Sequence, residues 1–224
     1  MDIKAEGIKR EFIRKMKDSN VFEAVQKTDF VLRAGELTML EGRSGGGKST
    51  FMSMLCGLLK PTEGKVTAGG TDLYSLSDDE LSKFRNLHFG IIPQVQTGIS
   101  SLTVRENILL PYTLYNEELP DARWLDELLK TLDIGNLADS MLSELSGGEL
   151  RRMTIARAMI RKPEILMADE PTGDLDDENT EMVLQLLQKA ARAGSAVLLV
   201  THENCAAGYA DVRYTMSGGV LREV

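Results

Sequence analysis

One short glycine-rich segment constrains the fold of this chain more than any other feature. Residues 42–50 read Gly-Arg-Ser-Gly-Gly-Gly-Lys-Ser-Thr and match the pattern G-x-x-x-x-G-K-[ST]. The apolar run 36–42 predicts a buried strand, and the run 49–59 predicts a helix with one apolar face. Glycines let backbone N–H groups converge on an anion without a Cβ in the way, and a helix N-terminus adds free N–H donors. The pattern therefore predicts a loop that binds phosphate.

Two side chains of this phosphate loop have expected roles. Lys48 is expected to reach the β- and γ-phosphates of a nucleotide, and the Ser49 hydroxyl is expected to ligate Mg²⁺. The alternative is a glycine-rich turn with a surface lysine. The complete pattern, placed between a predicted strand and a predicted helix, favours phosphate binding.

The composition limits the classes of partner and site. The net charge of −8 over 224 residues argues against nucleic acid as the main partner, because such binding needs a basic surface. The two cysteines, Cys56 and Cys205, have no C-x-x-C spacing, so neither a disulfide nor a metal framework is expected. Apolar stretches such as 196–200 fall far short of the ~20 residues of a membrane-spanning helix. Charged residues near the first methionine interrupt any apolar core of a signal peptide.

Apolar strands that alternate with helices predict an α/β fold with a mainly parallel sheet. Two N-terminal strands, 2–13 and 21–33, are expected to pair across a polar turn at 17–20. A further apolar strand is expected at 87–92, followed by an irregular segment at 95–102.

The expected organisation is a single domain over residues 1–224. Residues 1–94 and 161–224 are expected to form a core with its β-subdomain, and residues 95–160 a separate helical lobe.

Two carboxylates follow the apolar strand predicted at 165–168. Ligands of open α/β sheets bind outside the carboxyl ends of the strands, where Asp169 and Glu170 would lie. Asp169 is expected to serve Mg²⁺, directly or through water, and Glu170 to accept a proton from an attacking water. The alternative is a pair of solvated acids, which the phosphate loop upstream disfavours.

A second motif, Leu145-Ser146-Gly147-Gly148-Glu149, precedes a helix predicted to reach residue 160. Ser146 is expected to cap that helix, which leaves the Gly147 and Gly148 amides free at its N-terminus. This signature segment is a second device for binding phosphate within one chain.

Seven motifs appear in a fixed order along the sequence. They are Phe12, Gly42 to Thr50, Gln94, Leu145 to Glu149, Asp169-Glu170, Gly173 to Asp176, and His202. With this ordered set, the chain resembles the nucleotide-binding subunit of an ABC transporter. The resemblance implies a P-loop NTPase core with an N-terminal antiparallel β-subdomain and an inserted α-helical subdomain.

The resemblance also implies the roles of individual residues. Phe12 is expected to stack on adenine, and Gln94 to touch Mg²⁺ and the attacking water. His202 is expected to contact the γ-phosphate, and Asp176 belongs to a loop along a dimer seam. The residues expected around the phosphates are Gly42, Arg43, Ser44, Gly45, Gly46, Gly47, Lys48, Ser49 and Thr50.

The resemblance implies a homodimer as the active unit. In the family, the signature segment of one protomer closes on the γ-phosphate held by the other protomer's phosphate loop, so that two ATP molecules lie at a two-fold interface. A separate transmembrane permease-type subunit is the expected partner, which places this chain at the cytoplasmic face of the membrane. Nucleic acid is not an expected partner.

The run 168–173 and the Leu-Ser-Gly-Gly-Glu form of the signature segment resemble one branch of the family. That branch includes ATPases of lipoprotein-release, macrolide-efflux, antimicrobial-peptide-resistance and cell-division complexes. The chain departs from the branch at Pro93, where an aromatic residue is usual, and in the segment 95–100. These departures concern the identity of the membrane partner and not the chemistry of ATP.

Two alternatives from other functional classes remain. The first is an ABC ATPase without a transporter, which acts on nucleic acid, ribosomes or cluster assembly; the acidic charge argues against it. The second is a regulatory module that binds ATP with little turnover. The presence of both Glu170 and His202 argues against this second alternative.

Overall fold

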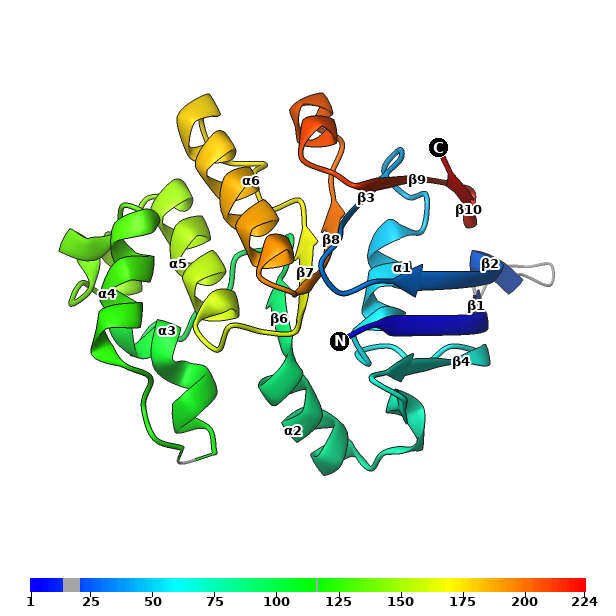
Figure 1. The fold of residues 1–224 in the computed structure, drawn as a ribbon, viewed down its shortest axis with the longest axis horizontal. Coiled ribbons are helices and arrows are strands. Elements are labelled where there is room, and N and C mark those ends of the chain that lie inside the picture. The colour runs from blue at the N-terminus through cyan, green and yellow to red at the C-terminus, as the bar shows by residue number, and fades with distance from the viewer. Residues whose placement is uncertain (14–20, 116) are drawn as a thin grey trace.

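The computed structural model describes residues 1–13, 21–115 and 117–224, which form two β-sheets and a group of helices (Figure 1). The turn predicted at 17–20 lies outside the described residues. Among the described residues, none of the helices could span a membrane.

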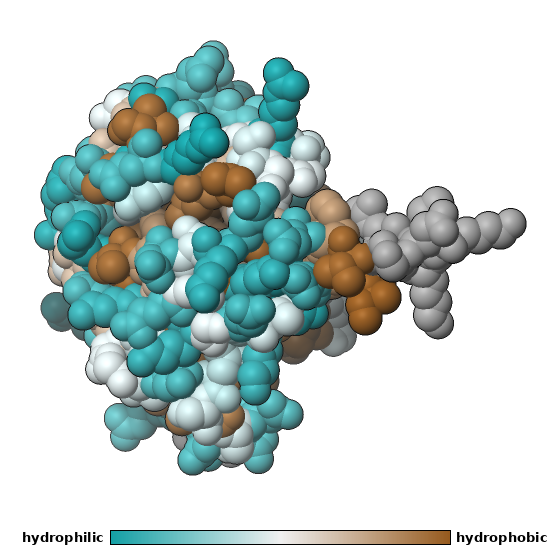
Figure 2. Space-filling model, turned by 90° about the vertical axis from the view of Figure 1, so that its right-hand side faces the viewer, coloured by the Kyte–Doolittle hydropathy of each residue, from teal (hydrophilic) through white to brown (hydrophobic). Residues whose placement is uncertain are grey.

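The N-terminal sheet is antiparallel and has the strand order β2-β1-β4-β5. The strands are β1 (Ile3–Ile13), β2 (Val21–Leu32), β4 (Glu63–Ala68) and β5 (Thr71–Asp72). Phe12 of β1 is paired directly with Phe22 of β2, so both side chains stand on the same face of the sheet. Exposed apolar side chains gather at this end of the two strands, where Figure 2 shows hydrophobic surface on an otherwise largely hydrophilic face.

The second sheet has the order β10-β9-β3-β8-β7-β6 and is parallel except at its β9–β10 edge. Its strands are β3 (Leu37–Glu41), β6 (Phe89–Ile92), β7 (Ile165–Asp169), β8 (Ala196–Val200), β9 (Val212–Ser217) and β10 (Val220–Glu223). All residues of β7 and β8 are buried, as expected for strands of a parallel sheet covered on both faces.

Alternate side chains of β7 point into two different hydrophobic cores. Leu166 and Ala168 pack with the cluster that includes α6 (Asp177–Arg192). Ile165 and Met167 pack with the opposite cluster, which includes α1 (Lys48–Leu55) and the antiparallel sheet. Figure 1 accordingly shows α1 between the two sheets and α6 on the other face of the parallel sheet.

The segment that follows β6 is helical. It contains α3 (Val104–Thr113), α4 (Ala122–Thr131) and α5 (Gly147–Met159), which lie together beyond α6 in Figure 1. Leu125, Leu128 and Leu129 form the buried face of α4. The indole N–H of Trp124 donates to the Ile160 carbonyl at 2.8 Å, which ties α4 to the end of α5.

Two predicted boundaries differ from the structure by more than one residue. The strand predicted at 87–92 begins only at Phe89, because the preceding helix α2 (Asp78–His88) continues through its first two residues. The helix predicted at 49–59 ends at Leu55, because Gly57 adopts a left-handed φ of 67° just beyond it. In both cases a continuous apolar pattern hid the change of backbone conformation.

Candidate functional site

The phosphate loop lies between β3 and α1, where its glycines meet other parts of the backbone. Gly47 has a φ of 104°, and a Cβ at this position would lie 2.3 Å from the Ala24 carbonyl oxygen. A Cβ on Gly42 would lie 2.1 Å from the Met216 carbonyl oxygen. Only glycine fits such contacts, so the loop is held tightly against β2 and β9.

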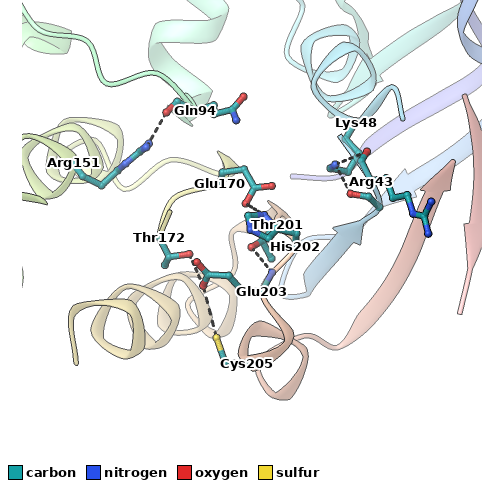
Figure 3. Close-up of polar contacts among 11 residues, drawn as sticks. Arg43, Lys48, Gln94, Arg151, Glu170, Thr172, Thr201, His202, Glu203 and Cys205 are labelled. Atoms are coloured by element: carbon teal, nitrogen blue, oxygen red, sulfur yellow. Dashed lines mark hydrogen bonds and ion pairs between the residues drawn. The ribbon is translucent and has the colours of Figure 1, made fainter. Parts of the chain in front are cut away.

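Lys48 is enclosed by the loop that precedes it. Its ammonium donates to the carbonyl of Gly42 at 2.6 Å and to that of Arg43 at 3.2 Å (Figure 3). The loop backbone thus curves around a positive charge at the N-terminus of α1, which is an arrangement suited to an anion.

A cavity of about 910 Å³ opens over this loop. Ligand sites in proteins commonly measure ~300–1,000 Å³, so a nucleotide fits such a volume. The predicted residues that line the cavity are Phe12, Gly42 to Thr50, Gln94, Asp169, Glu170 and His202. The structure therefore brings together side chains from β1, from the end of β7 and from the segments that follow β6, β7 and β8, which lie far apart in the sequence.

Asp169 ends β7 as a buried carboxylate. Its Oδ1 atom has no hydrogen-bond partner among the described residues. Burial raises the pKa of Asp169, while the neighbouring Ser49 hydroxyl acts in the opposite direction. A buried oxygen without a partner beside a hydroxyl is a suitable donor set for a hard cation.

A Mg²⁺ ion at this place would be held by the phosphates of a nucleotide as well as by protein side chains. In the described ranges, no group of three or more His, Cys, Asp and Glu side chains is arranged to hold a metal ion. Mg²⁺ is usually held by one or two carboxylates together with substrate phosphates and water, and not by a cage of protein ligands. Asp169 and Ser49 above a phosphate-binding loop fit that mode.

Glu170 and His202 form a pair at the edge of the cavity. Glu170 Oε2 lies 2.9 Å from Nδ1 of His202, and this hydrogen bond raises the pKa of the imidazole. The Glu170 side chain is only 14% exposed, whereas that of His202 is 72% exposed. Glu170 also has a left-handed φ of 48°, which is rare for a residue with a side chain and typical of functional sites.

Gln94 and Phe12 both line the cavity. Gln94 follows β6, and Figure 3 shows its side chain extending away from Arg151, which holds its backbone carbonyl. The Arg10 guanidinium lies 4.6 Å from the ring centroid of Phe12. One face of the Phe12 ring is thus covered by a cation, and the ring forms part of the cavity wall.

Four predicted residues do not line this cavity. Ser146 caps α5, in a capping box with Glu149, and Gly147 and Gly148 form the first turn of that helix. Asp176 caps α6 by accepting a hydrogen bond from the Asn179 N–H at 2.8 Å. The site on one chain therefore contains the phosphate loop and the carboxylates without the signature segment.

Two lining residues, Phe22 and Ala24, lie outside the predicted motifs. Gly173 and Asp174 also line the cavity; they belong to the predicted motif Gly173 to Asp176 but had no role of their own assigned. The pairing of Phe22 with Phe12 depends on the register of β1 and β2, which the sequence pattern did not fix. No sequence pattern pointed to Arg151, which contacts Gln94 from α5.

Comparison with known proteins identifies the family. The sequence model of the family described as "ABC transporter" matches residues 25–173. This chain belongs to the ABC transporter family. The predicted family and the predicted P-loop NTPase fold are thereby confirmed.

Curated relatives cover most of the chain. It is 37% identical over 190 residues to the ABC transporter ATP-binding protein YtrE of Bacillus subtilis, covering 84% of this chain and 82% of YtrE. It is also 37% identical over 190 residues to the lipoprotein-releasing system ATP-binding protein LolD of Colwellia psychrerythraea, covering 84% of this chain and 74% of LolD. LolD belongs to the branch of the family that the sequence resembles.

A solved structure matches nearly the whole fold. The ATP-binding cassette MJ0796, in a dimeric post-hydrolysis state bound to ADP and Pi, superposes with a TM-score of 0.91 at 31% identity. The match covers 99% of this chain and 97% of that one. The chain is an ATP-binding subunit and an ATPase, and the transporter relatives favour the transport function over both alternatives.

Proposed function

We propose that this ABC ATPase works as a homodimer that binds two molecules of ATP with Mg²⁺ and drives a separate transmembrane subunit. One observation carries the proposal. The cavity unites the phosphate loop, Asp169, Glu170 and His202, while the signature segment lies outside it. Each chain thus has both parts of an ATP site, but they lie at different places on its surface.

Nucleotide binding is the role of the phosphate loop and Phe12. The loop amides and Lys48 hold the phosphates. When the nucleotide binds, the Lys48 ammonium gives up its contacts with the Gly42 and Arg43 carbonyls and donates to phosphate oxygens instead. The adenine stacks on the face of Phe12 that Arg10 does not cover. Phe22 extends the aromatic wall beside Phe12.

Ser49, Asp169 and Gln94 are the residues that would hold Mg²⁺. The unpartnered Oδ1 of Asp169 supports this role for the carboxylate. The cation supplies charge neutralisation at the phosphates.

Glu170 accepts the proton of the attacking water. The contact at 2.9 Å between Glu170 and His202 keeps the carboxylate turned toward the end of β8, where His202 contacts the γ-phosphate. The low exposure of Glu170 limits competing solvation of its carboxylate.

The second chain completes the site. The N-terminus of α5 presents Ser146 and the backbone amides of Gly147 and Gly148. These groups and the positive end of the helix dipole suit the γ-phosphate held by the partner. Asp176, at the start of α6, lies along the same seam. We assign residues 1–94 and 161–224 to the nucleotide-binding core, and residues 95–160 to the helical part that moves when the dimer closes.

The proposed place of action is the cytoplasmic face of a membrane, on a permease-type partner. The names of two relatives, an ATP-binding protein of an ABC transporter and one of a lipoprotein-releasing system, support a membrane partner on another chain. The test is purification of the tagged chain from detergent-solubilised native membranes, followed by mass spectrometry. A stoichiometric membrane protein is expected, whereas recovery with ribosomes or DNA-processing proteins alone would overturn this part of the proposal.

The dimer and the catalytic role are tested with Glu170→Gln. This variant is expected to bind ATP, to lose turnover, and to elute as a dimer with ATP and Mg²⁺ on size-exclusion chromatography with light scattering. ATP turnover at the wild-type rate in this variant would show that Glu170 is not the proton acceptor. A monomer at saturating ATP, in the presence of the membrane partner, would contradict the homodimer.

A further inference from the structure

Arg151 connects the helix of the signature segment with the loop that carries Gln94. It lies in α5, the helix that Ser146 caps, and its side chain is only 3% exposed. Its Nη1 donates to the Pro93 carbonyl and its Nη2 to the Gln94 carbonyl, both at 2.8 Å (Figure 3). The same Nη2 lies 3.4 Å from Oδ2 of Asp174.

Asp174 brings a second loop into this network. Its Oδ2 also accepts a hydrogen bond from the Gln96 side-chain amide at 2.9 Å. Asp174 and Gln94 both line the cavity over the phosphate loop, whereas Arg151 does not. One guanidinium therefore joins α5 to two separate loops that form the wall of the nucleotide site.

A contribution to fold stability does not by itself explain why the Arg151 guanidinium is buried here. Two of its partners are neutral carbonyls, and its one carboxylate partner, Asp174, is 59% exposed. Its Nε has no hydrogen-bond partner among the described residues although it is buried. Replacing buried ionic groups with packed apolar side chains is often neutral or stabilising. The contacts of the Arg151 guanidinium therefore suit a link between segments that move relative to each other better than they suit stabilisation of a hydrophobic core.

We propose that Arg151 is a positioning residue that makes hydrolysis depend on the engagement of the partner's nucleotide. The inference rests on the proposed closure of a homodimer. When Ser146, Gly147 and Gly148 meet the γ-phosphate on the partner, α5 shifts as a rigid element, and Arg151 carries the shift to the Gln94 backbone and to Asp174. Gln94 and Asp174 then take their positions in the chain's own cavity. Arg151 acts through these residues and touches no reacting atom.

The test compares Arg151→Gln with a matched variant, Arg161→Gln. Arg161 is also largely buried; it contacts the Pro111 carbonyl and Glu117 and has no contact with the cavity. We expect both variants to lower the thermal unfolding midpoint by similar amounts. Arg151→Gln is expected to reduce kcat at least tenfold while ATP affinity by calorimetry changes less than twofold. Arg161→Gln is expected to keep kcat within twofold of the wild-type value.

Two further variants guard against a simple loss of folding. Arg151→Lys keeps the charge but can reach fewer acceptors, so its kcat is expected to lie between those of the wild type and Arg151→Gln. Asp174→Asn changes an exposed side chain and leaves the fold intact; its effect on kcat is expected to be less than additive with that of Arg151→Gln. Equal kcat in Arg151→Gln and Arg161→Gln, or full additivity with Asp174→Asn, would overturn the inference.

The wild-type chain separates this inference from the proposed function. If the wild type and its membrane partner fail to turn over ATP or to dimerise, the proposed function fails, and with it the basis for the inference. If the wild type turns over and dimerises while Arg151→Gln keeps its kcat, only the inference fails.

Discussion

The Thr172 hydroxyl donates a hydrogen bond to the Glu203 carboxylate at 2.8 Å, beside the contact between Glu170 and His202. Both contacts join the loop after β7 to the loop after β8. Thr172 is buried, and Figure 3 shows the two contacts next to each other. The positions of Glu170 and His202 are thus set by a second bridge that does not line the cavity.

The first prediction concerns this bridge. Thr172→Val removes the hydroxyl with little change of shape and is expected to lower kcat about three- to tenfold and the free energy of unfolding by about 1 kcal/mol. Glu203→Ala is expected to act similarly, and the double variant to lose little more than either single variant. Steady-state kinetics and urea unfolding measure both quantities. Additive losses in kcat would show that the two side chains act separately, and Thr172→Ser serves as the control that retains the hydroxyl.

The second prediction concerns Lys48. Its ammonium is the cation around which the phosphate loop curves. Lys48→Ala is therefore expected to weaken ATP binding itself, at least tenfold by calorimetry, and not only turnover. Lys60→Ala changes a lysine that has no part in the cavity and is expected to leave the affinity unchanged. An unchanged affinity for ATP in Lys48→Ala would show that Lys48 does not bind the phosphates.

The third prediction compares two glycines of the same loop. Gly47→Ala is expected to cost well over 2 kcal/mol, because strain at a φ of 104° adds about 1–3 kcal/mol to a clash with the Ala24 carbonyl. Gly45 also has a positive φ, 75°, but a Cβ there meets nothing within 4 Å. Gly45→Ala should therefore cost only about 1–2 kcal/mol. Denaturant unfolding measures the loss of stability in the two variants. Equal losses of the free energy of unfolding would contradict the clash with the Ala24 carbonyl as the cause.

The fourth prediction concerns the pH dependence of stability. Asp211 accepts hydrogen bonds from the Leu37 N–H at 2.8 Å and from Arg192 at 2.6 Å. Although partial burial acts to raise the pKa of Asp211, these donors hold it below its ordinary value. The stabilisation is fully present above the unfolded pKa of about 3.9 and is lost as the pH falls through the lower folded pKa.

Asp211→Asn tests this linkage. Its free energy of unfolding is expected to be lower than that of the wild type at pH 7, and the difference should shrink as the pH falls below about 4. Urea unfolding over this range measures it. Asp126→Asn, on the exposed face of α4, is expected to show no such trend. A difference that stayed constant down to the lowest pH would contradict the assigned cause.

Local patterns predicted the parts of the site that each depend on a short segment. The strand, loop and helix around Lys48 follow from one continuous pattern. The apolar run 165–168 placed Asp169 and Glu170 at a strand end, which the structure has as β7. The cap at Ser146 was expected from the residue type and is present with Glu149 as its reciprocal partner.

Other parts of the site depend on contacts between distant segments. The bond from Arg151 to the Gln94 carbonyl joins residues with no shared local pattern, and so does the bond from Thr172 to Glu203. The direct pairing of Phe12 with Phe22 depends on the register of two strands, which residue types alone did not fix. The sequence-based roles of the site residues remain predictions.

β7, which ends at Asp169 just before Glu170, sends its side chains into both hydrophobic cores. Freeing these carboxylates by local fluctuation would require both cores to open together, which is close to complete unfolding. Backbone amides of β7 should therefore exchange with deuterium about as slowly as any in the molecule. In the proposed mechanism, the proton acceptor is therefore held in a rigid part of the molecule, while the closing motion that brings up the signature segment takes place elsewhere.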